Sequence, residues 1–189
     1  MLSVVAWDGE GDGTNWSDPV NWSSDALPDS DDEVRIEIGG IDAIQHAAGI
    51  HSIQSLFSTR PLTLTGGTLE VGTTIQVDNA FRLQGGTLAD ATILPGNGGQ
   101  GLIFTSSGGT LDSVTADSDL DLATENSAHA YVENGLTLNS TAWLGSAAGS
   151  TSGGLYFRGT QSLSGTGEVV LGKHSSNYLK TYATTSAET

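Results

Sequence analysis

The sequence predicts an all-β protein, folded as a parallel β-solenoid in which short strands stack coil upon coil. Between about residues 34 and 172, short apolar runs alternate with polar residues and are separated by Gly, Ser, Thr and Asn, a pattern typical of strands. The tetrapeptide Gly-Gly-Thr-Leu occurs three times, at spacings of 19 and 23 residues, and such repetition is typical of solenoids. Gly-Gly pairs also favour hairpins, so an antiparallel β-sandwich is the alternative. The near-constant spacing of the whole unit favours the solenoid.

The three copies of the repeat lie at Gly66–Leu69, Gly85–Leu88 and Gly108–Leu111. Before the first copy, Leu62 and Leu64 alternate with threonines, so one face of this strand is apolar and the other polar. In the third copy two additional serines precede the glycines, and an insertion of two residues leaves every following side chain on its original face. At about 20 residues per coil, the chain makes roughly six or seven coils.

Residues 1–33 are expected to cap the N-terminal end of the solenoid. They hold three of the four tryptophans, Trp7, Trp16 and Trp22, and nine of the 22 acidic residues, and the first Lys or Arg is Arg35. An open solenoid end exposes core and unpaired strand edges, and large aromatic rings cover apolar area. The repeats proper are then assigned to residues 34–172.

Residues 173–189 lose the alternation and are expected to be a tail or a linker to a longer protein. This segment has no Trp-rich stretch comparable to that of the first 33 residues. We therefore expect an uncapped C-terminal end, through which copies of the chain would associate end to end.

The first 40 residues contain several motifs in an informative order. Trp7 begins a turn rich in Gly and Asp, which leads to Asn15-Trp16 and Asn21-Trp22, then to Pro28, an acidic turn and a first strand at Val34–Ile36. This order resembles the opening of large bacterial surface and secreted proteins, among them passenger regions with autotransporter-type β-strand repeats and giant extracellular proteins of planctomycete type. The resemblance implies a right-handed parallel β-helix, exported to the cell surface or the medium within a long adhesin-like or structural polypeptide.

The chain is strongly acidic, with 22 Asp and Glu against 6 Lys and Arg and a net charge of −16. Long-range repulsion opposes binding to phosphate backbones and anionic lipid surfaces, so nucleic acid is not an expected partner. The sequence has no run of 18 apolar residues, so membrane insertion is not expected either. The absence of cysteine excludes disulfides, thiolate nucleophiles and Cys-ligated zinc.

Asp8, Glu10 and Asp12, followed by Gly13, alternate oxygen ligands with glycines as calcium loops do. An EF-hand would need a bidentate Glu where this chain has Pro19, so any cage would be of another kind. We name these three acidic residues as candidate calcium ligands. The alternative is a set of solvated turn residues that contribute solubility.

Asp117, Asp119 and Asp121 alternate with apolar or small residues, and on a strand they would share one exposed face. A row of this kind is usually a solvated face. In a carbohydrate-binding or carbohydrate-active β-helix, Asp119 and Asp121 would instead line a groove together with solvent-facing aromatic side chains.

Four aromatic residues are candidates for a sugar-stacking platform if they face outward in register. Tyr156 alternates with apolar neighbours, so Tyr156 is expected to face solvent while Phe157 faces the core. Tyr131 is a further candidate. Trp143, beside Leu144, fits either face, and packing in the core is favoured.

The histidines show no metal-ligand spacing, and no Ser-His-Asp order stands out. Each is expected at the surface or rim: His46, His51, His129 and His174.

We therefore expect a non-enzymatic, structural or adhesin-like β-helix module, located at the cell surface or in the medium, with a surface glycan or protein as partner. The alternatives are a carbohydrate-binding or carbohydrate-active β-helix and a unit that self-assembles end to end.

Overall fold

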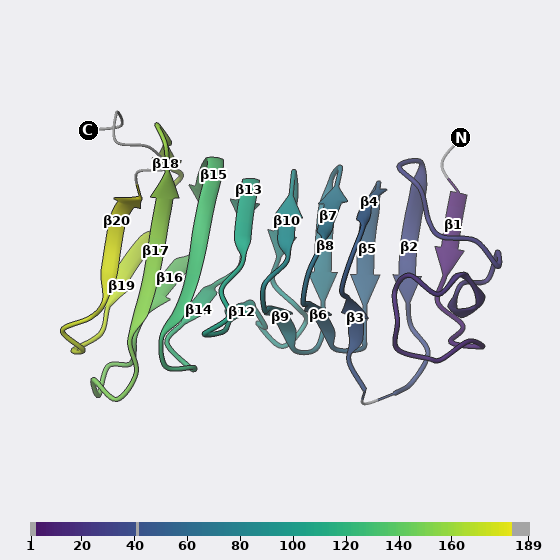
Figure 1. Ribbon diagram of the computed structural model, residues 1–189, viewed down its shortest axis with the longest axis horizontal. Helices are drawn as coiled ribbons and strands as arrows, with labels where there is room; N and C mark the ends of the chain where they lie inside the picture. The colour runs from purple at the N-terminus through teal and green to yellow at the C-terminus, as the bar shows by residue number, and fades with distance from the viewer. Residues whose placement is uncertain (1–2, 41, 183–189) are drawn as a thin grey trace.

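The computed structural model describes residues 3–40 and 42–182, which form a parallel β-solenoid of about seven turns (Figure 1). All pairings between the named strands of these residues are parallel. A sandwich built from hairpins would require antiparallel neighbours. The solenoid prediction is therefore confirmed, and the sandwich alternative was wrong.

Each coil contributes strands to three faces, which we call the first, second and third face in chain order. The first face is a seven-stranded sheet. Its strands are β3 (Ile44–His46), β6 (Leu62–Leu64), β9 (Phe81–Leu83), β12 (Leu102–Phe104), β14 (Leu120–Leu122), β16 (Thr141–Leu144) and β19 (Glu168–Leu171).

The second and third faces are joined because two long strands, β13 (Thr110–Ala116) and β15 (Ala128–Leu138), run through both. The other strands of the second face are β4 (Ile50–Ile53), β7 (Thr68–Val71), β10 (Thr87–Ala89), β17 (Gly153–Arg158) and β20 (Tyr178–Tyr182). The other strands of the third face are β1 (Ser3–Ala6), β2 (Asp32–Ile36), β5 (Ser55–Ser58), β8 (Thr74–Val77), β11 (Thr92–Leu94) and β18 (Leu163–Ser164).

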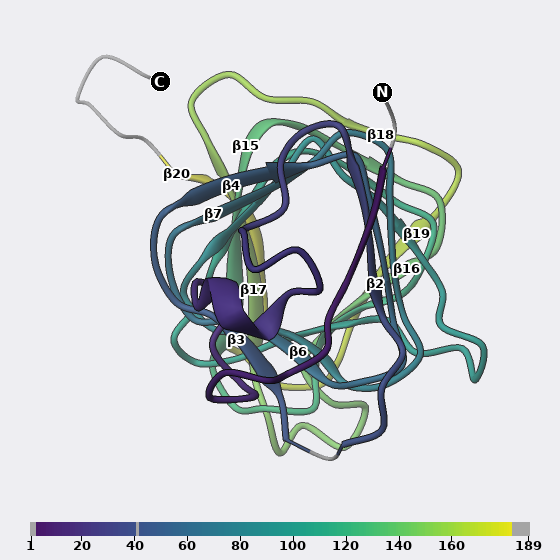
Figure 2. The same ribbon diagram turned by 90° about the vertical axis from the view of Figure 1, so that its right-hand side faces the viewer.

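The coils wind in a right-handed sense. Seen from the N-terminal end in Figure 2, the chain passes along the bottom at β3, rises on the left at β4 and continues down the right-hand side, while each coil lies farther from the viewer. A clockwise path that recedes from the viewer is right-handed. This is the hand usual for connections between parallel strands.

The repeated leucines form a buried ladder inside the solenoid. Leu69 pairs in register with Leu88, and Leu88 with Leu111. All three side chains are fully buried. On the first face Leu62 is likewise aligned with Phe81. Stacking of equivalent apolar residues from coil to coil removes their surface from water, which is the main stabilising contribution in repeat folds of this kind.

Residues 3–33 lie across the N-terminal end of this core (Figure 2). Trp7, Trp16 and Trp22 are buried there. The ring of Trp22 makes edge-to-face contacts with the other two, each with centroids 4.8 Å apart. This Trp cluster fits the expected cap. The segment also supplies β1, which pairs with β2 and so adds a strand to the third face.

Asn21 holds the loop of the cap together from its buried centre. Its Oδ1 accepts hydrogen bonds from the amides of Gly11 (3.1 Å) and Gly13 (2.8 Å). Its Nδ2 donates to Asp12 Oδ1 and to the carbonyl of Asn15, both at 3.0 Å. Asn21 also ends the 3₁₀ helix η1 (Pro19–Asn21), whose start is capped by the carboxylate of Asp18. One fully satisfied buried amide therefore orders the irregular chain between two of the tryptophans.

The expectation that all histidines lie at the surface or rim was wrong for His46. Its side chain is buried between the cap and the first coil, with its ring 5.8 Å from that of Trp16. Nδ1 donates to the carbonyl of Gly66 at 2.9 Å, so Nε2 accepts from Nδ1 of His51 at 2.8 Å. Burial lowers the pKa of His46, and the neighbouring His51 lowers it further. Burial also lowers the pKa of His51.

The histidine pair predicts a loss of stability in mild acid. Because both pKa values lie below the unfolded value of about 6.5, the unfolded chain binds more protons below that pH, and the free energy of unfolding falls as pH drops. We expect the Tm to be constant above about pH 7 and to fall from about pH 6.5 to 5. Circular dichroism melts at several pH values measure this.

A double variant, His46→Gln with His51→Gln, should flatten the slope over this pH range. The matched double variant, His129→Gln with His174→Gln, should keep it, because neither residue belongs to the buried pair. An equal slope in both double variants would contradict the assignment. The carboxylates whose pKa values are lowered, such as Asp12, titrate below this range.

At the other end of the solenoid, inward-facing positions lie uncovered. Leu163, Leu171 and Leu179 are 42%, 52% and 42% exposed. In the preceding coil the residues paired with them are buried: Leu136, Leu144 and Leu155. The segment 173–189, assigned from the sequence as a tail or linker, contains β20, which pairs with β17. Residues 183–189 lie outside the described part of the chain.

Candidate functional site

The outward side chains of the first face form one continuous row. Ile103 on β12 is aligned with Asp121 on β14, and Asp121 with Trp143 on β16. Trp143 is 41% exposed, so the favoured core position for this residue was wrong. Its neighbours Ala142 and Leu144 take the inward positions instead, because side chains alternate along a strand.

A groove of about 530 Å³ lies over this row. Ile103 and Trp143 supply apolar surface, Asp119 and Asp121 supply carboxylates, and Thr124 and Gln100 complete the polar lining. Its volume falls within the range of sites that bind small molecules, roughly 300–1,000 Å³. The groove brings together Asp119, Asp121 and an exposed aromatic ring, as the carbohydrate alternative requires.

Asp119 fixes the orientation of the Trp143 ring. Its Oδ2 accepts a hydrogen bond of 3.1 Å from the indole Nε1. Its Oδ1 accepts from the hydroxyl of Ser140 and, at 3.0 Å, from the amide of Thr141. An exposed aromatic ring held in one orientation loses less conformational entropy when a ligand packs against it.

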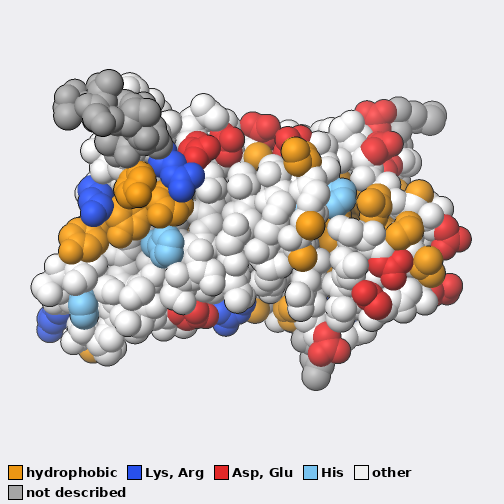
Figure 3. All heavy atoms as spheres, in the orientation of Figure 1, with side chains coloured by type: hydrophobic (Ala, Val, Ile, Leu, Met, Phe, Trp, Pro, Cys, Tyr) orange, Lys and Arg blue, Asp and Glu red, His pale blue; other side chains and the backbone are white. Residues whose placement is uncertain are grey.

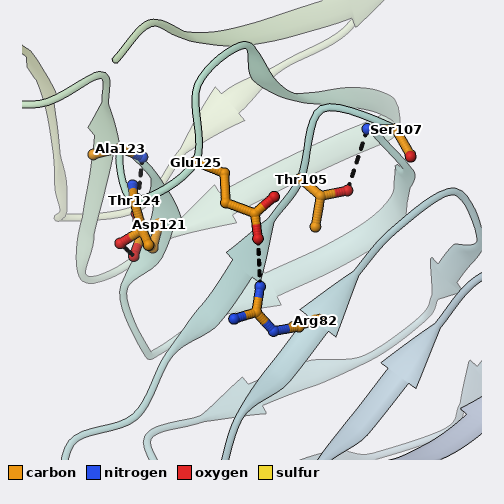
Figure 4. A network of polar contacts seen from close by, with 7 residues as sticks. All are labelled: Arg82, Thr105, Ser107, Asp121, Ala123, Thr124 and Glu125. Atoms are coloured by element: carbon orange, nitrogen blue, oxygen red, sulfur yellow. Dashed lines mark hydrogen bonds and ion pairs between the residues drawn. The ribbon is translucent and has the colours of Figure 1, made fainter. Parts of the chain in front are cut away.

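Asp121 orders the loop that follows β14 (Figure 4). Its Oδ1 accepts from the amides of Ala123 and Thr124, both at 2.8 Å, and its Oδ2 accepts from the Thr124 hydroxyl. In the same view Arg82, on β9, reaches Glu125 of that loop, and their ion pair measures 2.6 Å. The wall of the groove formed by this loop is therefore held by contacts from two different coils.

The charge state of Asp119 does not suit the role of a general acid. Burial raises the pKa of Asp119, but hydrogen bonds from Ser140, Thr141 and Trp143 outweigh it, so the pKa is lowered overall. Glycoside hydrolysis needs a general acid whose pKa is raised. An ionised Asp119 whose oxygens accept three hydrogen bonds is suited to positioning the ring and accepting ligand hydroxyls.

The candidate calcium residues lie in the cap, away from the groove. Asp8 Oδ1 accepts from the amide of Glu10 at 3.2 Å, and Asp12 Oδ1 accepts from Thr14 (2.9 Å) and Asn15 (2.8 Å). The hydrogen bonds from the amides of Asn15 and Thr14 lower the pKa of Asp12. Within residues 3–40 and 42–182, no three His, Cys, Asp or Glu side chains converge as metal ligands would. Calcium binding here stays a prediction.

The four aromatic candidates do not form a single platform. Phe157 is buried in the core and Tyr156 faces outward, both as expected. Tyr156 is aligned with Tyr131, but on the second face. Trp143 lies on the first face. Ile103 is not among the residues predicted from the sequence, because every residue of Leu-Ile-Phe is apolar. Only the burial of Leu102 and Phe104 reveals that Ile103 points outward.

Comparison with protein-family models, with curated proteins and with solved structures finds no match. In the described part of the chain, no helix is both long and apolar enough to cross a membrane. The structure therefore supports the β-solenoid that the resemblance implies, and no family match supports an autotransporter or planctomycete origin.

Proposed function

We propose that this chain is a non-enzymatic structural module of a bacterial extracellular or cell-surface protein of the adhesin type. The observation that carries the proposal is the continuous stack of coils, capped at its N-terminal end by the Trp cluster. Stacked parallel coils make a stiff rod, because each coil is hydrogen-bonded and packed to its neighbours. The acidic surface keeps such a rod soluble.

The uncovered C-terminal end gives this module a way to join a neighbour. Leu171 and Leu179 present apolar surface next to the outer edges of β19 and β20, which pair with no further strand in the described part of the chain. Edges of this kind pair readily with further strands. A following coil or the end of a second copy would cover them, which supports a role as one unit of a longer fibre.

Immunolabelling of the source bacterium tests this proposal. An antibody against the purified chain should label intact cells or concentrate in the medium. Labelling that requires permeabilised cells would overturn the extracellular role. A panel of polysaccharides incubated with the chain should release no reducing ends, and release would overturn the non-enzymatic assignment.

A second candidate function, carbohydrate binding, is favoured by the groove at Trp143. An exposed indole ring flanked by carboxylates that accept hydrogen bonds is suited to a neutral sugar, whose C–H face packs on the ring while its hydroxyls donate to oxygen. The lining supplies both kinds of contact side by side.

Replacing Trp143 by alanine should abolish most of this binding. We expect at least a tenfold loss of affinity, roughly 1.4 kcal/mol, for whichever neutral oligosaccharide of a glucan, mannan and xylan panel binds best, measured by calorimetry. Trp143→Phe should retain part of the affinity. Val20→Ala is the control, an exposed apolar residue in the cap. Equal affinity in the Trp143→Ala and control variants would contradict this function.

A further inference from the structure

All four tyrosines of the chain lie on one patch of the second face, across its last three coils. Other outward positions of the solenoid carry mostly small polar or acidic side chains, such as Thr68 and Glu70 on β7. Figure 3 shows this patch at the left, with hydrophobic side chains beside Lys, Arg and His. We call it the tyrosine strip: His129, Tyr131, Tyr156, Arg158, Tyr178, Lys180 and Tyr182.

The rings of the strip contact one another from coil to coil. Tyr131 lies 5.7 Å from both Tyr156 and Tyr182, measured between ring centroids. Tyr156 and Tyr182 are 6.3 Å apart. His129 extends the group at 5.6 Å from Tyr131. Rings that pack against their neighbours in this way form a rigid surface that a ligand does not need to order.

Two of the six Lys and Arg residues of this acidic chain lie within the strip. The guanidinium carbon of Arg158 lies 3.7 Å from the centroid of Tyr131, and the same group forms an ion pair of 2.8 Å with Glu133. Nζ of Lys180 lies 4.5 Å from the centroid of Tyr178 and 5.1 Å from that of Tyr156.

No carboxylate within residues 3–40 and 42–182 forms an ion pair with Lys180. Among the described residues, both ion pairs of Lys or Arg with an acidic residue involve arginines, Arg82 and Arg158. An ammonium group held over two aromatic rings, with no carboxylate partner in the described part of the chain, is a ready partner for an anion.

A hollow of about 250 Å³ is lined by Tyr156 and Tyr178, the two rings over which Nζ of Lys180 lies. It exists because β17 has Gly154 where the neighbouring strands carry His129 and Tyr178. A Cβ at Gly154 would lie 2.7 Å from the hydroxyl oxygen of Tyr156, so glycine leaves room for that ring. Serine side chains complete the wall: Ser127, Ser152 and Ser176.

The tyrosine hydroxyls can act as donors toward this hollow. Burial raises the pKa of Tyr156, and the neighbouring Tyr131 and Tyr178 raise it further. Its hydroxyl therefore remains protonated at physiological pH. The strip thus offers an ammonium group and hydroxyl donors in one place, without a free carboxylate among its own members.

We propose that the tyrosine strip binds an acidic polysaccharide, with sugar carboxylates held by Lys180 and the tyrosine hydroxyls. Coils are spaced by about 4.8 Å, close to the length of one sugar residue, so successive sugars of a chain lying along the solenoid meet successive coils. The proposal goes beyond the structural role, and it does not depend on the groove at Trp143, which lies on another face.

The net charge of −16 does not prevent this binding. The acidic cap lies at least four coils from the strip, roughly 19 Å at the usual strand spacing. The Debye length at physiological ionic strength is about 8 Å, so the repulsion from the cap is largely screened. Glu133, which lies on the same strand as Tyr131, is already paired with Arg158.

Affinity electrophoresis of the intact chain in gels that contain polygalacturonate tests the proposal, with dextran gels as the neutral reference. We expect polygalacturonate to retard the chain, dextran to leave it unchanged, and added salt to weaken the retardation. Lys180→Gln should raise the apparent Kd at least fivefold, and Tyr156→Ala should do the same. Melting curves of each variant establish that it is folded.

Lys173→Gln is the matched control, because it removes the same charge from the same end of the molecule but outside the strip. It should change the Kd less than twofold. An equal effect of Lys173→Gln and Lys180→Gln would overturn the proposal in favour of a diffuse charge effect. Equal retardation by dextran, or equally tight binding of single-stranded DNA, would overturn the assignment to acidic polysaccharides. Trp143→Ala should leave polygalacturonate binding unchanged.

Discussion

Replacing Trp22 by alanine should lower the free energy of unfolding by about 3–5 kcal/mol. The ring of Trp22 sits between those of Trp7 and Trp16, and its Nε1 donates to the carbonyl of Trp16 at 2.9 Å. The substitution removes a fully buried side chain and leaves that carbonyl without this donor. Urea unfolding followed by circular dichroism measures the change.

Trp143→Ala provides the control for this prediction, because it removes the same side chain from an exposed position. We expect it to cost less than about 1 kcal/mol. If the two variants were equally stable, the Trp cluster would not be part of the core that unfolds cooperatively. Loss of the cap also exposes the first coil, so Trp22→Ala should aggregate at lower protein concentration than Trp143→Ala.

The fold could be predicted from the sequence because a repeated motif indicates a repeated structural unit. A single Gly-Gly-Thr-Leu is compatible with a hairpin. Three copies at nearly constant spacing require that equivalent leucines have equivalent surroundings, which only stacking provides. The register of Leu69, Leu88 and Leu111 confirms this reasoning.

The errors arose where local patterns leave the direction of a side chain open. Ala142, Trp143 and Leu144 are all apolar, so hydrophobicity does not show which of them points inward, and the strand pairing decides it. His46 is polar but occupies an inward position, because the carbonyl of Gly66 and the ring of His51 satisfy its ring nitrogens. Neither partner can be read from its sequence neighbours.

Only part of the candidate site could be predicted, because the sequence shows which residues alternate along a strand but not which side chains meet in space. Asp119 and Asp121 follow the alternation of a strand, so their exposure could be predicted. Their closeness to Trp143 could not, because it depends on the length of the coil between β14 and β16. The tyrosine strip is a stronger example: its residues come from three coils of different length, so no fixed spacing in the sequence identifies them.

Gly67→Ala should cost roughly 2–5 kcal/mol, although it adds a single methyl group. Gly67 lies at the corner between β6 and β7, with φ of +66°. The left-handed conformation costs an L-residue about 1–2 kcal/mol. A Cβ there would also lie 2.7 Å from the carbonyl carbon of Ala48 and would collide with the carbonyl oxygen of Gly49. These are backbone atoms of the preceding coil, so the collision cannot be relieved by rotating a side chain, and overpacking adds about 1–3 kcal/mol.

Gly99→Ala separates the two contributions. Gly99 has a similar φ of +77°, but a Cβ there would meet no atom within 4 Å. This variant should therefore show only the conformational cost, roughly 1–2 kcal/mol, and the difference between the two variants in urea unfolding measures the contact between coils. If Gly67→Ala and Gly99→Ala destabilised the protein equally, the repeated glycines would serve only to turn the chain. A larger cost at Gly67 would mean that the repeated glycines also set how closely one coil approaches the next. This role would explain why the Gly-Gly pair of the repeat, and not only its leucine, recurs along the chain.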